Sequence, residues 1–132
     1  MLYKYKDSYK KIAMGLLSFI PDLKDISHLQ TELDWYQKDA SRFLYLWKNE
    51  NGDFSGVVGF ELVNKQVIVR HIALSPAERN EGVTYKILDE LATLYPEAKM
   101  MGSLEIAAII TKWEQRKDGE WKWTNEVNLQ IS

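Results

Sequence analysis

The N-terminal part of the chain shows first the alternation of a strand and then the spacing of a helix. Residues 2–6, LYKYK, alternate apolar and polar side chains, as a short strand does. From Asp7 onward the apolar residues recur every three or four positions, which predicts a helix capped by Asp7 or Ser8 and stopped by Pro21. Its expected buried face consists of Tyr9, Ile12, Ala13, Leu16, Leu17 and Ile20.

A second helix is predicted from Asp25 or Ser27 to about Lys38. Ser27 and Gln30 have the spacing of a capping box, in which two side chains satisfy backbone N–H groups at the helix start. The side chains expected to face the core are Ile26, Leu29, Leu33 and Tyr36.

The middle of the chain has the period of β-strands. Residues 42–48, RFLYLWK, form a candidate buried strand, and the Asn-Gly pair at 51–52 turns the chain into a second strand at 55–62. A further turn at 64–65 leads into a third strand at 66–74. We expect a three-stranded antiparallel meander.

Helical spacing returns in the last third of the chain. A helix is predicted at 87–95, followed by a short strand at 99–102 and a second helix over 103–113. Strict alternation at 121–131 predicts a final strand. The expected order is β-αα-βββ-α-β-α-β, which describes an α+β fold with a central mixed, mostly antiparallel sheet flanked by helices.

The composition excludes several classes of function. With 132 residues, 45% of them hydrophobic, the chain can form one core, so we expect a single domain over residues 1–132. The net charge of -2 provides no basic field for nucleic acid or an anionic membrane. The absence of cysteine excludes thiol nucleophiles and Cys-rich zinc sites, and it agrees with a cytoplasmic location. The apolar run at 12–20 is far shorter than the roughly 20 residues that span a bilayer.

The segment SPAERNEGVTY, residues 75–85, leads from a strand into a helix. The first N–H groups of a helix lack intrahelical partners and lie at the positive end of its dipole, so they favour a phosphate. Gly82 lets a phosphate approach the backbone, and Arg79 can add a charge-assisted hydrogen bond, whereas Glu81 should point away. The alternative is a plain turn whose acidic residues favour the helix dipole and which binds nothing.

Residues 69–91, VRHIALSPAERNEGVTYKILDEL, resemble the acetyl-CoA-binding segment of the GNAT superfamily of N-acetyltransferases. In that family a strand and a Pro-containing turn lead through Arg/Gln-x-x-Gly-x-Gly/Ala into a helix. The element order predicted above also matches the family's fold. The resemblance implies an acetyl-CoA-dependent N-acetyltransferase that acts on a small-molecule or protein amine.

The resemblance places acetyl-CoA at the end of the third meander strand and on the turn that follows. Backbone groups of residues 72–74 would pair with pantetheine, and residues 79–84 would wrap the pyrophosphate with successive N–H groups. No metal ion is needed, because the helix terminus supplies the positive pole. The implied cofactor-binding residues are Ile72, Ala73, Leu74, Arg79, Asn80, Glu81, Gly82, Val83 and Thr84.

Acetyl transfer needs a neutral amine, so an amine with a pKa of about 10 must first lose its proton to a base. His71 and Glu61, both on strands of the meander, are the candidate bases. Each has a structural alternative. His71 could be a hydrogen-bonded, partly buried imidazole. Glu61 shares a strand face with Gly59, opposite Val58 and Phe60, and could be a solvated side chain.

The chain departs from the family at the general acid. Many GNAT enzymes have a tyrosine on the helix after the fifth strand, and here TKWEQRKDG places Trp113 at that position. An indole N–H is too weak an acid to protonate the departing thiolate. Either the thiolate leaves without side-chain protonation, or Tyr85 or Tyr45 substitutes, or the domain binds acyl-CoA without efficient turnover.

A closer resemblance covers residues 4–30, 42–48 and 69–82, which are similar to a group of small GNAT-fold proteins encoded with riboflavin biosynthesis genes in Gram-positive bacteria. It implies either an enzyme or a CoA-binding or interaction module of that pathway. The remaining alternative is a structural domain with an empty helix terminus. Trp121 and Trp123 lie on a final strand whose open edge predicts a homodimer.

Overall fold

The computed structural model describes residues 1–78 and 81–116 of the chain. The predicted final strand at 121–131, and with it the predicted dimer contact, lies outside the described residues, as do Arg79 and Asn80. In the part of the chain that is described, no helix combines the length and the apolar character needed to cross a membrane.

The N-terminal segment forms a short strand and two helices, as predicted. The second helix begins one residue after Asp25, whose carboxylate accepts the backbone N–H of Ser27 at 2.8 Å. The predicted capping box is therefore wrong, because Asp25 is the cap and the Ser27 hydroxyl donates to the same carboxylate. The elements are β1 (Leu2–Lys4), η1 (Asp7–Tyr9), α1 (Lys10–Leu17), η2 (Pro21–Leu23) and α2 (Ile26–Lys38).

Two residues predicted to face the core lie at its margin. Ile26 is 69% exposed, because it is the first residue of α2 and the buried cluster begins one turn later at Leu29. Ile12 is 39% exposed, because it flanks the stripe of α1 that is buried. The other predicted core residues of α2, Leu33 and Tyr36, are buried.

Among the described residues the sheet contains five strands in the order β1-β2-β3-β4-β5. The first four are antiparallel neighbours, whereas β5 runs parallel to β4 after the crossover through α3. Asn64 and Lys65 form the tight turn between β3 and β4 with φ of 49° and 61°. The elements are β2 (Arg42–Lys48), β3 (Phe54–Val63), β4 (Gln66–Leu74), η3 (Pro76–Glu78), α3 (Glu81–Leu94) and β5 (Lys99–Gly102).

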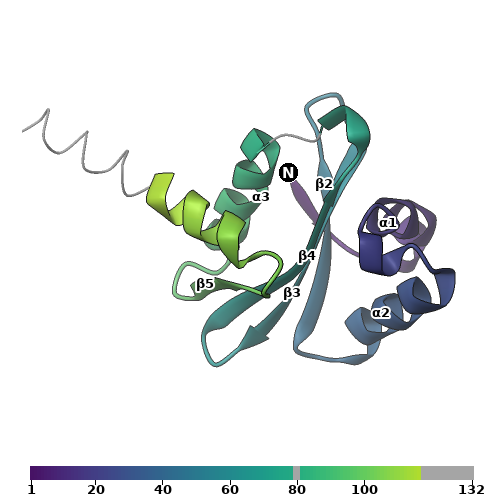
Figure 1. Ribbon diagram of the computed structural model, residues 1–132, viewed down its shortest axis with the longest axis horizontal. Coiled ribbons are helices and arrows are strands. Elements are labelled where there is room, and N and C mark those ends of the chain that lie inside the picture. The colour runs from purple at the N-terminus through teal and green to yellow at the C-terminus, as the bar shows by residue number, and fades with distance from the viewer. Residues whose placement is uncertain (79–80, 117–132) are drawn as a thin grey trace, which may run out of the picture.

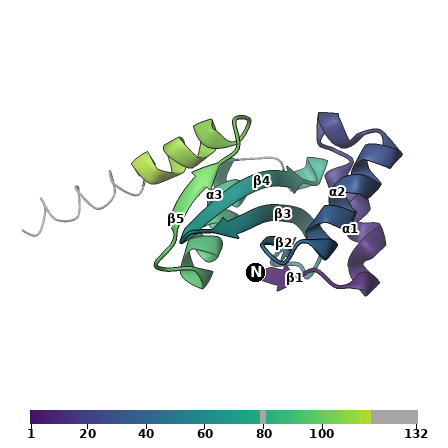
Figure 2. The same cartoon turned by 90° about the horizontal axis from the view of Figure 1, so that it is seen from below.

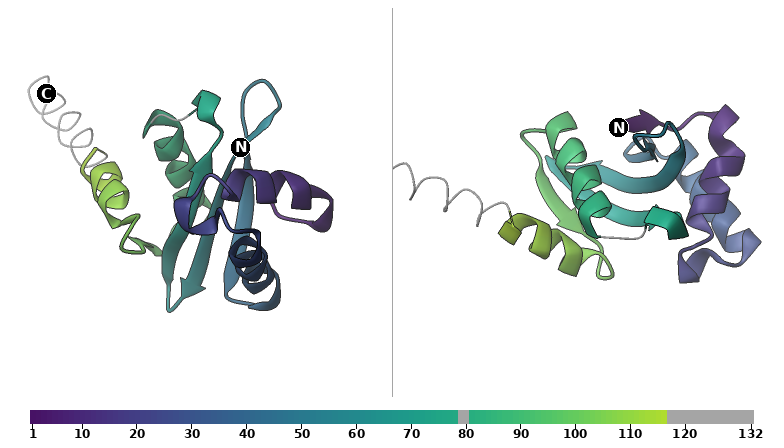
Figure 3. Two further views of the ribbon diagram at one scale, coloured as in Figure 1. Left: turned by 45° about the vertical axis from the view of Figure 1, so that its right-hand side comes forward. Right: turned by 90° about the horizontal axis from the view of Figure 1, so that it is seen from above.

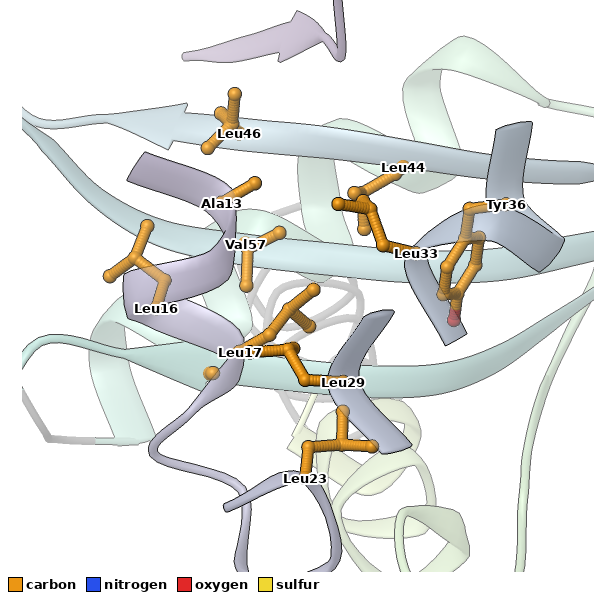
Figure 4. Close-up of a cluster of buried hydrophobic side chains, with 11 residues drawn as sticks. Ala13, Leu16, Leu17, Leu23, Leu29, Leu33, Tyr36, Leu44, Leu46 and Val57 are labelled. Atoms are coloured by element: carbon orange, nitrogen blue, oxygen red, sulfur yellow. The ribbon is translucent and has the colours of Figure 1, made fainter. Parts of the chain in front are cut away.

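Helices cover both faces of the sheet. Figure 1 and Figure 2 show α1 and α2 on one face, and α3 with the helical segment at 107–116 on the other. The alternation of strand side chains divides the core accordingly. Val57 packs with α1 and α2 (Figure 4), whereas its neighbour Val58 packs with α3. The predicted α+β architecture with a mixed, mostly antiparallel sheet flanked by helices is confirmed.

A bulge in β4 changes this alternation. The register moves from Val69 to His71 between two successive residues of β3, so Arg70 has no partner there. A bulge adds one residue and so exchanges the two faces for the residues beyond it. Val69 before the bulge and Ile72 after it both pack on the α3 side, and His71 faces α2, where its ring meets Tyr36.

The sheet opens between β4 and β5. The two strands pair only from Gln66 to Val69 on β4, and beyond this point Ser103 N–H donates to the Val69 carbonyl at 2.9 Å as the chain turns away. Figure 3 shows the following helical segment at 107–116 diverging from the sheet. Residues 70–74 of β4 therefore have no strand beside them on this edge among the described residues.

Candidate functional site

A cleft of about 540 Å³ lies along the open edge of β4. Its walls come from the turn between α1 and η2, from α3, and from the residues that follow β5. Most lining side chains are apolar, which suits an elongated ligand with few charges in its middle part. The cleft contains four of the residues implied for acetyl-CoA, namely Ile72, Ala73, Leu74 and Thr84.

The backbone of β4 presents polar groups to this cleft. Ser75 N–H donates to the Ser55 carbonyl at 2.8 Å, so the backbone of Ser75 faces β3. Successive residues of a strand direct their N–H and C=O groups to opposite edges. The backbone groups of Ile72 therefore point to the open edge, where an extended ligand could pair with them as a further strand would.

The chain that leads from β4 into α3 is anchored to the sheet by Glu78. The Glu78 carboxylate accepts hydrogen bonds from the Ser55 hydroxyl and the Asn49 side-chain amide, each at 2.5 Å. Of the six residues implied for the pyrophosphate, Arg79 and Asn80 lie outside the described residues, and the other four begin α3. The phosphate role of this helix start stays a prediction.

His71 lies where this cleft meets a second one. Its Nδ1 is 2.6 Å from the Tyr36 hydroxyl oxygen, and the two rings meet edge to face. Burial lowers the pKa of His71 to about 4, and the positive charges of Arg70 and Arg42 act in the same direction. The imidazole is therefore neutral at neutral pH, in a position that lines both clefts.

The second cleft has a volume of about 570 Å³ and lies between η2, α2 and the residues after β5. It shares Arg70, His71 and Glu105 with the first cleft. Its remaining lining includes the carboxylates of Asp22 and Glu32, so the second cleft has more acidic side chains than the first. Sequence reasoning missed Tyr36, Arg70 and Glu105 as members of the site, because no local motif marks them.

The second candidate base, Glu61, lies in an ion-pair cluster on the sheet. Its Oε1 is 2.7 Å from Arg70 Nη1 and 3.1 Å from Arg42 Nη2. Arg42 also lies 3.8 Å from Glu32 on α2. Glu61 lines neither of the two clefts that meet at His71. The structure therefore places His71 at both clefts and Glu61 at neither, while Arg70 contacts Glu61 and lines both clefts.

Trp113 faces α3 and lines neither of the two clefts. Its indole N–H donates to Asp89 at 2.8 Å, and the side chain is buried in the core on this side of the sheet. The described residues that line the first cleft include no tyrosine. Among residues 1–78 and 81–116 there is also no group of three or more acidic or histidine side chains that could hold a metal ion.

The sequence is similar over most of its length to a curated bacterial protein. It is 38% identical over 115 residues to an uncharacterized N-acetyltransferase in the lysA 3′ region of Bacillus methanolicus, covering 86% of this chain and 95% of the relative. No family model matches the sequence.

The fold is similar to solved N-acetyltransferase structures. The aminoglycoside 6′-N-acetyltransferase AAC(6′)-Ih from Acinetobacter baumannii has a TM-score of 0.60 at 15% identity, covering 89% of this chain and 87% of that one. A chimera of the spermidine N-acetyltransferase SpeG from Vibrio cholerae and hSSAT has a TM-score of 0.65 at 12% identity, covering 87% and 78%. At these identities the likeness shows the fold, while the Bacillus relative shows the family. The chain belongs to the GNAT superfamily of N-acetyltransferases.

Proposed function

We propose that this protein transfers an acetyl group from acetyl-CoA to a small-molecule or protein amine. The observation that carries the proposal is the meeting of two clefts at His71, on the open edge of β4. One cleft has apolar walls and follows a strand edge beside which no further strand lies among the described residues, and the other offers carboxylates. A transfer between two substrates needs such adjoining sites, because both reacting groups must be held in contact.

The first cleft fits acetyl-CoA, which supplies an acetyl group activated as a thioester. The backbone of Ile72 would pair with the amide groups of the pantetheine arm, and the side chains of Ala73 and Leu74 lie in the same wall. Thr84, in the first turn of α3, lines the cleft at the end where residues 79–84 would bind the pyrophosphate.

We assign the base to His71 and keep Glu61 as the second candidate. His71 lines both clefts and is neutral at neutral pH, so it can accept a proton from the attacking amine. Glu61 is held by two arginines and lines neither cleft, so it would have to act through bridging water. Both assignments rest on where the side chains lie relative to the two clefts.

A CoA-binding or interaction module with little turnover is the second candidate function. Two observations favour it. Trp113, which stands where many GNAT enzymes have a tyrosine, faces Asp89 on α3, and the described residues that line the first cleft include no tyrosine. In the transferase reading the thiolate leaves without protonation by a side chain. Tyr85 and Tyr45, the two alternatives, pack partly buried against the core on the α3 side.

Titration calorimetry with acetyl-CoA tests the binding part of the proposal. We expect measurable heat and a rise in melting temperature, because a ligand that binds only the folded state stabilises it. A missing heat signal together with an unchanged melting temperature would contradict both candidate functions. Thiol release on a panel of amines then separates them, since the module binds acetyl-CoA without releasing thiol.

The acceptor is expected to carry a positive charge before it loses its proton. Asp22→Asn should raise the KM for the amine by about fivefold, because one carboxylate of the second cleft is removed, and leave the KM for acetyl-CoA unchanged. Glu97→Gln is the matched control, since this exposed carboxylate precedes β5 and lines neither cleft. Equal amine KM values for the two variants would argue against a cationic acceptor.

The place of the protein in metabolism is a further part of the proposal. Residues 4–30, 42–48 and 69–82 resemble RibT, a small GNAT-fold protein encoded with riboflavin biosynthesis genes in Gram-positive bacteria. This resemblance supports a role in that pathway. The amine panel should therefore include the diamino-pyrimidine intermediates of riboflavin synthesis, and their acetylation would support the link.

A further inference from the structure

Three acidic residues line the second cleft, and they differ in what neutralises them. Glu32 forms an ion pair with Arg42 at 3.8 Å. Asp22 and Glu105 form no ion pair within the part of the chain that the structure describes. Both of these residues are exposed, so a charged ligand in the cleft can reach their carboxylates.

The arginines near the cleft are already balanced by other carboxylates. Arg70, which lines the cleft, has its Nη1 2.7 Å from Glu61 Oε1, and Arg42 Nη2 lies 3.1 Å from the same oxygen. Arg42 also pairs with Glu32 and, at 4.0 Å, with Asp39. Neither arginine is therefore left to balance the other two carboxylates of the cleft.

The histidines of the lining add no positive charge at neutral pH. His71 is neutral because burial lowers its pKa to about 4, and His28 is neutral at pH 7. The charges of Asp22 and Glu105 thus stay uncompensated among the described lining residues. A ligand with two positive charges would balance both of them, whereas a ligand with one would leave a carboxylate unbalanced.

The two uncompensated carboxylates come from different walls of the cleft. Asp22 lies in η2, and Glu105 follows β5. Glu105 also lines the first cleft together with His71, so it stands at the junction where the reacting amine must lie. Asp22 lines the second cleft only. The positive charges of the ligand should therefore be separated, with one of them at the junction.

Apolar side chains lie next to both carboxylates. Leu23 follows Asp22 and Leu104 precedes Glu105, and all four residues line the cleft. Leu104 is 99% exposed, so a carbon chain that crosses the cleft would cover apolar surface that is now in contact with water. Burying one methylene group strengthens binding about fourfold. A chain of methylene groups between two ammonium groups fits both features of this lining.

We propose that the acceptor is a linear alkyl diamine, bound by Glu105 through one ammonium group and by Asp22 through the other, with its carbon chain against Leu104. The inference rests on the proposed function, because it takes the second cleft as the acceptor site. The ammonium group at Glu105 first releases a proton to water. As its nitrogen forms the C–N bond with the acetyl carbon, a second proton passes to His71, and the C–S bond breaks as the thiolate leaves with its electron pair. The other amine stays protonated at Asp22.

Acetylation of 1,4-diaminobutane and of butylamine by the full chain tests the proposal. The two amines have carbon chains of equal length and differ by one positive charge. The KM for the diamine is expected to be about fivefold lower, because only the diamine can pair with both carboxylates. Equal KM values for the two amines would overturn the inference and leave the proposed function intact. Acetylation of a diamino-pyrimidine in place of both alkyl amines would also overturn it.

Two variants assign the carboxylates. Glu105→Gln should raise the KM for both amines about fivefold, because every acceptor must place an amine at the junction. Asp22→Asn should raise the KM for the diamine by the same factor and leave that for butylamine unchanged. Glu97→Gln, which changes an exposed carboxylate outside both clefts, is the control and should alter neither value. A preference for the diamine that survives in Asp22→Asn would contradict the second ammonium site.

Binding measured by NMR titration of the full chain, with CoA present, gives an answer that needs no turnover. In the wild type 1,4-diaminobutane is expected to bind about fivefold more tightly than butylamine, and Asp22→Asn should remove the difference. Tighter binding of the diamine without thiol release from any amine would contradict the proposed function and still support a ligand with two positive charges. Equal binding of the two amines, or binding of neither, would overturn the inference.

Discussion

Gly59→Ala is expected to destabilise the folded state by about 2–3 kcal/mol. The added methyl group would overlap the hydroxyl and Cζ of Tyr36, whose ring lies in the buried cluster between α2 and the sheet. Close-packed surroundings leave the ring no unoccupied space to enter, so either the helix or the strand must shift. Denaturant unfolding followed by tryptophan fluorescence measures the loss.

Gly15→Ala is the matched control for this substitution. Gly15 lies within α1, and a Cβ atom there meets nothing within 4 Å. Alanine has the higher helix propensity, so this variant should be more stable than the wild type by about 0.5–1 kcal/mol. Because the two substitutions should change the free energy of unfolding in opposite directions, the pair separates the steric effect at Gly59 from the general effect of removing a glycine.

A double substitution identifies Tyr36 as the cause. If the ring is what the methyl group meets, Gly59→Ala should cost at least about 1 kcal/mol less in a Tyr36→Leu background than in the wild type. Equal costs in the two backgrounds would mean that the strain lies elsewhere in β3.

His71→Gln is expected to lower kcat by about 100-fold or more, because a glutamine cannot take the amine proton. The KM for acetyl-CoA should change little, since pantetheine would be held by the backbone of β4. Glu61→Gln is the comparison, and a larger loss there than in His71→Gln would transfer the role of base to Glu61.

His71→Gln should also be more resistant to acid unfolding than the wild type. The pKa of His71 is about 4 in the folded protein and about 6.5 in an unfolded chain, so between these values the unfolded state binds the proton first. His71 therefore costs no stability above pH 6.5, and its cost grows to at most about 3 kcal/mol as the pH falls to 4. Urea unfolding at several pH values should show a shallower acid decline in His71→Gln. Parallel declines would contradict the burial of a neutral imidazole.

Local patterns were sufficient for most of the fold. The strands at 42–48 and 66–74 have the bounds that alternation and turn residues predict, because strand period and turn chemistry are properties of neighbouring residues. The end of α2 at Lys38 and the bounds of the strand at 99–102 also agree with the predictions from sequence. The mistakes at Ile12 and Ile26 concern burial, which depends on how far the opposing surface extends.

The geometry of the candidate site was less predictable than the fold, because it depends on tertiary contacts. Residues 72–74 were placed in the cleft by family resemblance, but the opening between β4 and β5 that exposes their backbone follows from where β5 ends. Glu61 was a candidate base as a carboxylate on a strand of the meander, and strand parity left open that it is solvated, but two arginines from other strands bind it. Neither neighbour is predictable from the residues adjacent to Glu61.

The sequence by itself determined the order of the strands and helices over the described residues and the segment that resembles an acetyl-CoA site, since these are encoded over short stretches of chain. Only the tertiary structure decided that His71 faces α2. The bulge at Arg70 arises from the pairing of two strands, and without the extra residue His71 would lie on the other face of the sheet. Packing then brings Tyr36 and the gap above Gly59 to the same point, because residues 35 positions apart meet only when helix and sheet close together.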